Sequence, residues 1–182
     1  MIISRISDTL YLSAALLSAG VGSVYDIRSS RIPNVLTASS IAIGLLLHLI
    51  LGGWSQLAFS FVGGLIGGGL FLIFFLLGGM GAGDVKLMAA VGCLVGLGSL
   101  SRVLIATVLV GATLALLLAF YRGRLRETIT NVAALAAHYQ ENGLSRHDEL
   151  SLENVLTLRM PYAVPIAIGC MAALWMLIEG GS

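Results

Sequence analysis

Residues 57–77 read LAFSFVGGLIGGGLFLIFFLL and contain no charged side chain. At 1.5 Å per residue, a helix of this length spans about 30 Å, the thickness of the hydrocarbon core of a bilayer. Its glycines, at positions 63, 64, 67, 68 and 69, recur at spacings that let a neighbouring helix approach closely. The stretch therefore predicts a membrane-crossing helix that packs tightly against another helix.

Similar apolar stretches recur along most of the chain. With 58% hydrophobic and only 10% charged residues, the composition is far from the roughly 25% charged that is typical of soluble domains. The sequence predicts an all-α polytopic membrane protein, folded as one domain over residues 1–182. Its six expected transmembrane segments are residues 9–25, 35–51, 57–77, 85–100, 103–121 and 161–178.

The positive charges favour one orientation in the membrane, because Lys and Arg gather on the cytoplasmic side. In the expected topology Arg5 and Arg102 fall on one side, and all other cations fall on the opposite side. These are Arg28, Arg31, Lys86, Arg122, Arg124, Arg126, Arg146 and Arg159. We therefore expect an inner (cytoplasmic) membrane protein with both termini outside. The first segment is expected to be retained, not cleaved as a signal peptide, because Asp8 precedes its apolar run.

Residues 122–160 form the one long polar segment, which is expected in the cytoplasm. Leu125, Ile129, Val132 and Ala136 recur at helical spacing, opposite polar side chains. This pattern predicts an amphipathic helix on the membrane surface. Its role stays open between a solvated connection and a surface that docks substrate or regulates access.

Several function classes are disfavoured by composition. The net charge is +1 and the cations are scattered, so a nucleic-acid partner is not expected. Cys93 and Cys170 lie inside apolar runs, where small buried thiols are the ordinary interpretation. The three histidines share no metal-ligand spacing with them, and they assemble no Ser-His-Asp or Cys-His arrangement. We expect neither a metal nor a cofactor.

Two of the nine acidic residues stand apart from the rest. Asp26 and Asp84 each lie at the cytoplasmic end of an expected span, at the same depth, with two spans between them. A carboxylate beside apolar helices is energetically costly, so it is usually paired with a cation or has a function. One interpretation is boundary anchoring, with Asp26 paired to Arg28 or Arg31 and Asp84 paired to Lys86. The glycines of residues 78–83 favour a second interpretation, a site that cuts a peptide. They allow irregular backbone beside Asp84 and leave room for an extended peptide.

Two neighbouring carboxylates can share one proton. The ionised member then activates a water, while the protonated member polarises a carbonyl, as in aspartic proteases. Which acid would hold the proton stays open, since coupled sites titrate as a unit.

Both acids lie in recognisable motifs. Gly81-Ala82-Gly83-Asp84-Val85-Lys86-Leu87 resembles the GxGD-x-K-L signature of the type IV prepilin peptidases. Asp26-Ile27-Arg28, followed by Arg31-Ile32-Pro33-Asn34, is similar to the stretch that carries the other catalytic aspartate of that family. The resemblance covers roughly residues 10–120.

The resemblance implies a membrane aspartyl endopeptidase that removes the leader peptide of a prepilin or pseudopilin. Asp26 and Asp84 would be the catalytic pair, without a metal. Gly81, Gly83, Lys86, Arg28 and Asn34 would support the site or bind substrate. Nothing in the chain matches the cytoplasmic region with paired cysteines found in the methylating members, so N-methylation is not expected.

The subgroup and two other function classes stay open. The short form, with its polar segment before Met160-Pro161-Tyr162-Ala163-Val164-Pro165, resembles peptidases of tight-adherence (Flp-type) pili. Archaeal preflagellin peptidases are the nearest competing subgroup. A proton-coupled transporter would also use membrane acids, but would place them near the midplane. A non-catalytic subunit of a pilus or secretion assembly would need neither aspartate. The sequence does not predict the oligomeric state.

Overall fold

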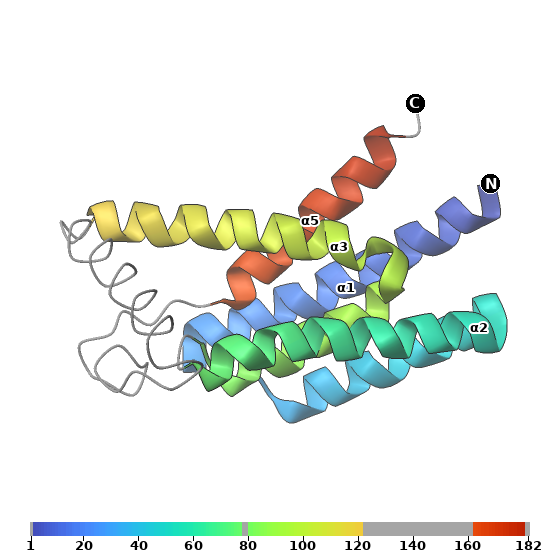
Figure 1. The fold of residues 1–182 in the computed structure, drawn as a ribbon, viewed down its shortest axis with the longest axis horizontal. Helices are drawn as coiled ribbons and strands as arrows, with labels where there is room; N and C mark the ends of the chain where they lie inside the picture. Colours follow the sequence, from blue (N-terminus) through green and yellow to red (C-terminus); the bar gives the residue numbers. More distant parts are fainter. Residues whose placement is uncertain (1, 78–79, 122–161, 181–182) are drawn as a thin grey trace, which may run out of the picture.

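The regular structure of the chain is helical. The computed structural model describes residues 2–77, 80–121 and 162–180, and within these it contains four helices (Figure 1). They are α1 (Ile2–Ser29), α2 (Asn34–Leu76), α3 (Ala82–Tyr121) and α5 (Ala163–Glu179). The prediction of an all-α fold is confirmed. The predicted surface segment, residues 122–160, lies outside the described residues.

Helices α2 and α3 each contain a sharp reversal at one glycine. Gly53 has φ 70° and Gly96 has φ 64°, a left-handed conformation that only glycine adopts without a steric penalty. Each helix runs back along the bundle after this residue (Figure 1). The sequence predicted short loops around residues 52–54 and 96–99. In the structure each connection is a sharp turn at one glycine, Gly53 within α2 and Gly96 within α3, so the prediction of short connections at these places is confirmed.

Three of the helices contain a stretch long and apolar enough to cross a membrane. These stretches are Ile6–Ser29 in α1, Asn34–Leu76 in α2 and Ala82–Leu118 in α3. Helix α5 is also apolar, but it has only 17 residues. The described helices therefore have the length and the apolar composition expected of a protein that crosses a membrane several times.

Two predicted boundaries shift in a way that affects the acidic residues. The first span was expected at 9–25, but α1 continues to Ser29 and includes Asp26. The glycine string was expected to stay irregular up to Asp84, but α3 begins at Ala82. The helix begins early because the Asp84 side chain accepts a hydrogen bond from the Gly81 backbone N–H, which satisfies one donor of the new helix.

The first half of α3 is the centre of the bundle. Its side chains Leu87, Met88, Val91 and Leu94 are almost completely buried, in one cluster with residues of α1 and α5. These partners include Leu12, Ala15 and Ala19 of α1, and Ile166, Cys170 and Ala173 of α5. Burial of such a central helix on several sides is why its sequence is apolar around its whole circumference.

Glycines bring α2 into backbone contact with α3. A Cβ atom added at Gly44 would lie 2.8 Å from the Cys93 carbonyl, and one added at Gly67 would lie 3.0 Å from the Met88 carbonyl oxygen. Gly63, Gly64 and Gly68 meet α3 just as closely, while Gly69 faces open space. The predicted close packing is thus confirmed for four of the five glycines. Cys93 and Cys170 are buried free thiols, as predicted.

A buried histidine, His48, contacts three helices at the end of the bundle away from Asp26 and Asp84. His48 is 2% exposed, its ring stacks on Tyr11 at 3.9 Å, and its Nδ1 lies 2.9 Å from the Gly44 carbonyl oxygen. The reversal at Gly96 lies directly on the same ring, with 2.7 Å between Nε2 and the position of a Cβ. Tyr11, His48 and Gly96 also line a cavity of about 400 Å³ together with Asp8. Helices α1, α2 and α3 therefore meet at this one imidazole.

Candidate active site

The end of α1 presents Asp26. The helix stops because Ser30 adopts φ 51°, a left-handed conformation, while its backbone N–H still donates to the Asp26 carbonyl oxygen at 2.8 Å. Ser29 supports the turn, since its hydroxyl can donate to the carbonyl oxygens of Tyr25 at 2.8 Å and Arg31 at 3.2 Å. A serine in this conformation costs about 1–2 kcal/mol, and such strained residues cluster at functional sites.

A short link then leads into α2. Pro33 is the N-cap of α2, with an extended backbone (ψ 134°), and the amides of Leu36 and Thr37 point to its carbonyl oxygen at 3.1 and 3.4 Å. Proline suits this position because its φ is fixed and it has no N–H to satisfy. The link from Ser30 to Pro33 is therefore short, and α2 begins beside the end of α1 that carries Asp26.

Asp84 lies in the first turn of α3. Its Oδ2 accepts a hydrogen bond from the Gly81 N–H at 3.2 Å, and its own N–H donates to the Gly81 carbonyl oxygen at 3.1 Å. This is half of a capping box, in which an acidic third residue reaches back to the N-cap amide. The side chain is 7% exposed and its Oδ1 is shielded from solvent. Helix capping thus fixes both the place and the orientation of this carboxylate.

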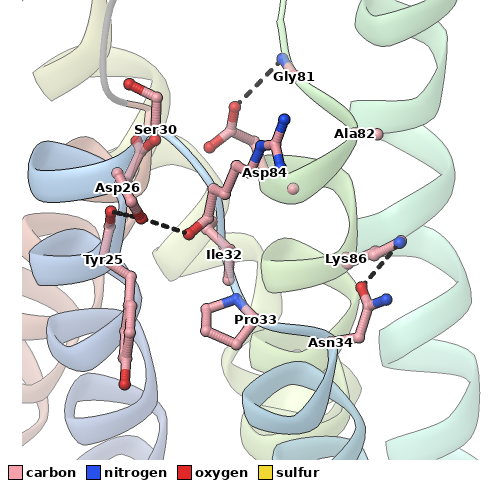
Figure 2. Close-up of a pocket in the computed structure, with 13 residues that line it drawn as sticks. Tyr25, Asp26, Ser30, Ile32, Pro33, Asn34, Gly81, Ala82, Asp84 and Lys86 are labelled. Carbon is pink, nitrogen blue, oxygen red and sulfur yellow. Dashed lines mark hydrogen bonds between the residues drawn. The ribbon is translucent and has the colours of Figure 1, made fainter.

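One cavity brings the two acids together. It has a volume of about 620 Å³ and is open on one side, with Asp26 on the α1 wall and Asp84 on the α3 wall (Figure 2). Asp26 is partly exposed, while its Oδ2 is shielded. The full lining is Tyr25, Asp26, Ser29, Ser30, Arg31, Ile32, Pro33, Asn34, Gly81, Ala82, Gly83, Asp84 and Lys86. Two carboxylates from separate helices therefore face the same solvent-accessible space.

The predicted supporting residues are mostly in this cavity. Lys86 Nζ donates a hydrogen bond to Asn34 Oδ1 at 3.0 Å, and both residues line the wall (Figure 2). Gly81 and Gly83 line it as well, and a Cβ at Gly83 would only touch the Ile32 side chain at 3.4 Å. Arg28 is exposed on the last turn of α1 and is not part of the lining. The structure therefore groups all the predicted site residues except Arg28.

Two features of the site were not predicted from sequence. The α1–α2 link forms a large part of the lining, although the sequence pointed only to the motif residues within it. The start of α5 lies at the end of α1 that carries Asp26, because the Ser23 hydroxyl donates a hydrogen bond to the Ala163 carbonyl oxygen at 2.8 Å. The sequence had placed Pro161 and Tyr162 at the start of the last expected span, residues 161–178, without relating this span to Asp26. In the described residues, no three His, Cys, Asp or Glu side chains gather as metal ligands.

The fold and these apolar helices define the class of polytopic helical membrane proteins. Within this class, the chain belongs to the type IV leader peptidase family. The sequence model of that family matches residues 10–116. That range includes both acids and the whole cavity lining. Members of this family are aspartic-type prepilin peptidases. No curated protein and no solved structure matches the chain.

Proposed function

We propose that this chain is a membrane aspartyl endopeptidase that removes the leader peptide from type IV prepilins or pseudopilins, with Asp26 and Asp84 as its catalytic pair. The observation that carries the proposal is that these two acids, from different helices, line the same cavity. Family membership supports the substrate class. The resemblance of the polar segment before Met160-Pro161-Tyr162-Ala163-Val164-Pro165 to the tight-adherence (Flp-type) pilus peptidases supports that subgroup.

The proposed reaction is hydrolysis of one peptide bond. The ionised acid takes a proton from a water, whose oxygen attacks the scissile carbonyl carbon, while the protonated acid donates a hydrogen bond to the carbonyl oxygen. The tetrahedral intermediate then collapses, the C–N bond breaks, and a proton passes to the leaving amine. A cavity of about 620 Å³ that is open on one side has room for an extended segment of a few residues.

The two acids lie at helix ends of opposite polarity. Asp84 is in the first turn of α3, where the positive end of the helix dipole and the Gly81 N–H favour a carboxylate. Asp26 is in the last turn of α1, where the negative end of the dipole favours the neutral acid. Each helix end contributes about 0.3–1 kcal/mol, and both act in the same direction. Burial of the Asp84 side chain acts in the opposite direction, because it favours the neutral acid, so we propose that the two acids share one proton without assigning it to either.

We place the site at the cytoplasmic face of the inner membrane, with six crossings of the bilayer. The reversals at Gly53 and Gly96 support this topology, because each divides a long apolar helix into two halves that run in opposite directions (Figure 1). Arg28, Arg31 and Lys86 lie at the same end of the bundle as the two acids, which suits the cytoplasmic side. The basic leader of a prepilin would approach from this side, and its apolar helix would remain in the membrane.

The test is leader removal in cells. The chain is co-expressed with candidate prepilins from the same genome, recognised by a basic leader before an apolar helix, and processing is followed on gels. Asp26→Asn and Asp84→Asn are each expected to abolish processing. Asp8→Asn is the matched control, because it changes an acid of the same helix that lines the opposite cavity.

Undiminished cleavage in either catalytic variant would reject the aspartate pair. A proton flux across vesicles that disappears in the same variants would favour a transporter instead. Comparable protein levels in the membrane fraction are required for all variants, so that a loss of processing reports chemistry and not a loss of protein.

A further inference from the structure

A second cavity lies at the end of the bundle away from the two acids. Its volume of about 400 Å³ is within the range of about 300–1,000 Å³ that is usual for ligand sites. The reversals at Gly53 and Gly96 create it, because they place residues from both halves of α2 and both halves of α3 around one space beside α1. The full lining is Asp8, Tyr11, His48, Gln56, Phe59, Val95, Gly96, Leu97, Gly98, Ser99 and Arg102.

Helix α1 gives the depth of this cavity in a membrane. Asp8 lines the second cavity and Asp26 lines the first, and the stretch of α1 between them rises about 27 Å at about 1.5 Å per residue. The hydrocarbon core of a bilayer is about 30 Å thick. When the bundle spans a bilayer with the first cavity at one surface, the second cavity therefore lies at the other surface, level with the lipid headgroups.

Two opposite charges line this second cavity. Asp8 of α1 and Arg102 of α3 are both half-buried, and among the described side chains of the cavity no ion pair joins the two. The Arg102 guanidinium donates a hydrogen bond to Ser99 Oγ at 3.2 Å, which uses one of its several N–H groups. Partial burial of a charge is costly unless an opposite charge is near. A ligand that carries both signs of charge would satisfy Asp8 and Arg102 together.

The uncharged polar groups add an acceptor and a donor. His48 Nδ1 lies 2.9 Å from the Gly44 carbonyl oxygen, which can only accept, so Nδ1 carries a hydrogen. In the neutral ring, Nε2 is then a hydrogen-bond acceptor. The Gln56 side chain, from the other half of α2, can donate through its amide nitrogen. The cavity thus offers groups for an ammonium and groups for a phosphate.

Apolar side chains border the same cavity. Phe59 and Leu97 are part of its lining, and both remain exposed on the surface of the bundle. At the depth derived above, such exposed apolar side chains face the upper part of lipid acyl chains. A polar cavity that adjoins apolar surface at this level suits an amphiphile better than a fully polar molecule.

We propose that this cavity binds the headgroup of a phospholipid with a primary ammonium, as in phosphatidylethanolamine. The phosphate bonds the Arg102 guanidinium, whose planar fork matches its oxygens, and the ammonium donates to the Asp8 carboxylate. The acyl chains lie against Phe59 and Leu97. An anionic headgroup without an amine would leave Asp8 without a counter-charge, and a choline headgroup has no N–H to donate to it.

The first test needs no variant. Dissociation constants are measured by native mass spectrometry for the purified full chain in detergent, with phosphatidylethanolamine, phosphatidylglycerol and phosphatidylcholine of identical acyl chains. Phosphatidylethanolamine is expected to bind about tenfold more tightly than the other two, the effect of one charge-assisted hydrogen bond. It should also raise the melting temperature most, because it binds the folded bundle across three helices. Equal affinities for the three lipids would overturn the proposal.

The second test assigns the headgroup to its residues. Arg102→Gln and Asp8→Asn are each expected to weaken binding of phosphatidylethanolamine about tenfold, and Asp8→Asn should also abolish its advantage over phosphatidylglycerol. Arg28→Gln and Glu179→Gln are the matched controls, since each removes one exposed charge outside the cavity. They should bind like the parent. Unchanged lipid affinity in both cavity variants would reject this site.

A third measurement separates a lipid from a free zwitterion. Glycerophosphoethanolamine carries the same headgroup without acyl chains and is not expected to displace phosphatidylethanolamine at equal concentration. Displacement at equal concentration would overturn the assignment to a lipid. The result is independent of the proposed peptidase function, because lipid binding is measured without a substrate.

Discussion

Lys86 Nζ donates a hydrogen bond to Asn34 Oδ1 at 3.0 Å, across 52 positions of sequence. The bond joins the first residue of α2 to the early turns of α3, and both residues line the cavity. Both motifs had been recognised separately. The structure shows that they are physically connected, and that the connection holds the α1–α2 link in place beside Asp84.

The first prediction concerns this bond. Lys86→Met is expected to slow leader cleavage several-fold with little effect on stability, because an exposed hydrogen bond contributes at most about 1 kcal/mol. Asn34→Ala should have a similar effect, and the double variant should be no slower than either single variant. Rates of the four proteins, measured side by side, give the coupling. Strictly multiplicative effects would show that the two residues act independently.

The second prediction concerns Gly81. A Cβ added there would lie 3.3 Å from Asp84 Oδ2, which is tighter than an ordinary contact. Gly81→Ala should therefore displace the carboxylate and lower the cleavage rate about tenfold, equivalent to about 1.4 kcal/mol in the transition state. Gly69→Ala is the control, since its Cβ would meet open space. Equal rates in the two variants would contradict a fixed position for Asp84.

The third prediction concerns helix packing. A Cβ at Gly92 would collide with the backbone of Gly63, and neither chain segment can yield as a flexible side chain would. Gly92→Ala should destabilise the protein by about 1–3 kcal/mol and lower its melting temperature in detergent. Gly20→Ala, whose Cβ meets nothing within 4 Å, should be neutral or slightly stabilising because alanine favours the helix. A melting temperature unchanged by Gly92→Ala would show that α2 and α3 do not pack as described.

The fourth prediction concerns the attachment of α5. Ser23→Ala removes the buried hydroxyl that bonds the Ala163 carbonyl oxygen, at a cost of about 0.6–1.5 kcal/mol. Since Ser23 lies one turn before Asp26 on α1, we also expect slower cleavage. Ser39→Ala, which removes an exposed hydroxyl bonded within its own turn of α2, is the control for thermal melting. If both serine variants behave like the parent, Ser23 does not anchor α5.

The sequence predicted the helical fold and much of the site because both depend on local patterns. Apolar runs of membrane length and the spacing of glycines are readable one segment at a time. The motifs around Asp26 and Asp84 were likewise sufficient to select Gly81, Gly83, Asn34 and Lys86, all of which line the cavity.

The parts that were not predicted depend on contacts between distant segments. The early start of α3 follows from the side-chain hydrogen bond of Asp84 to Gly81, which outweighs the poor helix propensity of glycine. The attachment of α5 to the end of α1 follows from the hydrogen bond between Ser23 and Ala163, and no spacing rule relates positions 23 and 163. Arg28 carries its charge on the exposed side of α1, a matter of helix phase that the motif alone does not reveal.

The reversals at Gly53 and Gly96 also bear on how such a protein would be made. Because each turn is confined to about one residue, the two halves of α2 and the two halves of α3 can enter the bilayer as paired hairpins. In the topology proposed above, translocation would then export hardly any hydrophilic chain at these points, and a ribosome on the cytoplasmic side could complete each pair before the next emerges. A bulky side chain at either glycine would therefore hinder biogenesis before it affected catalysis.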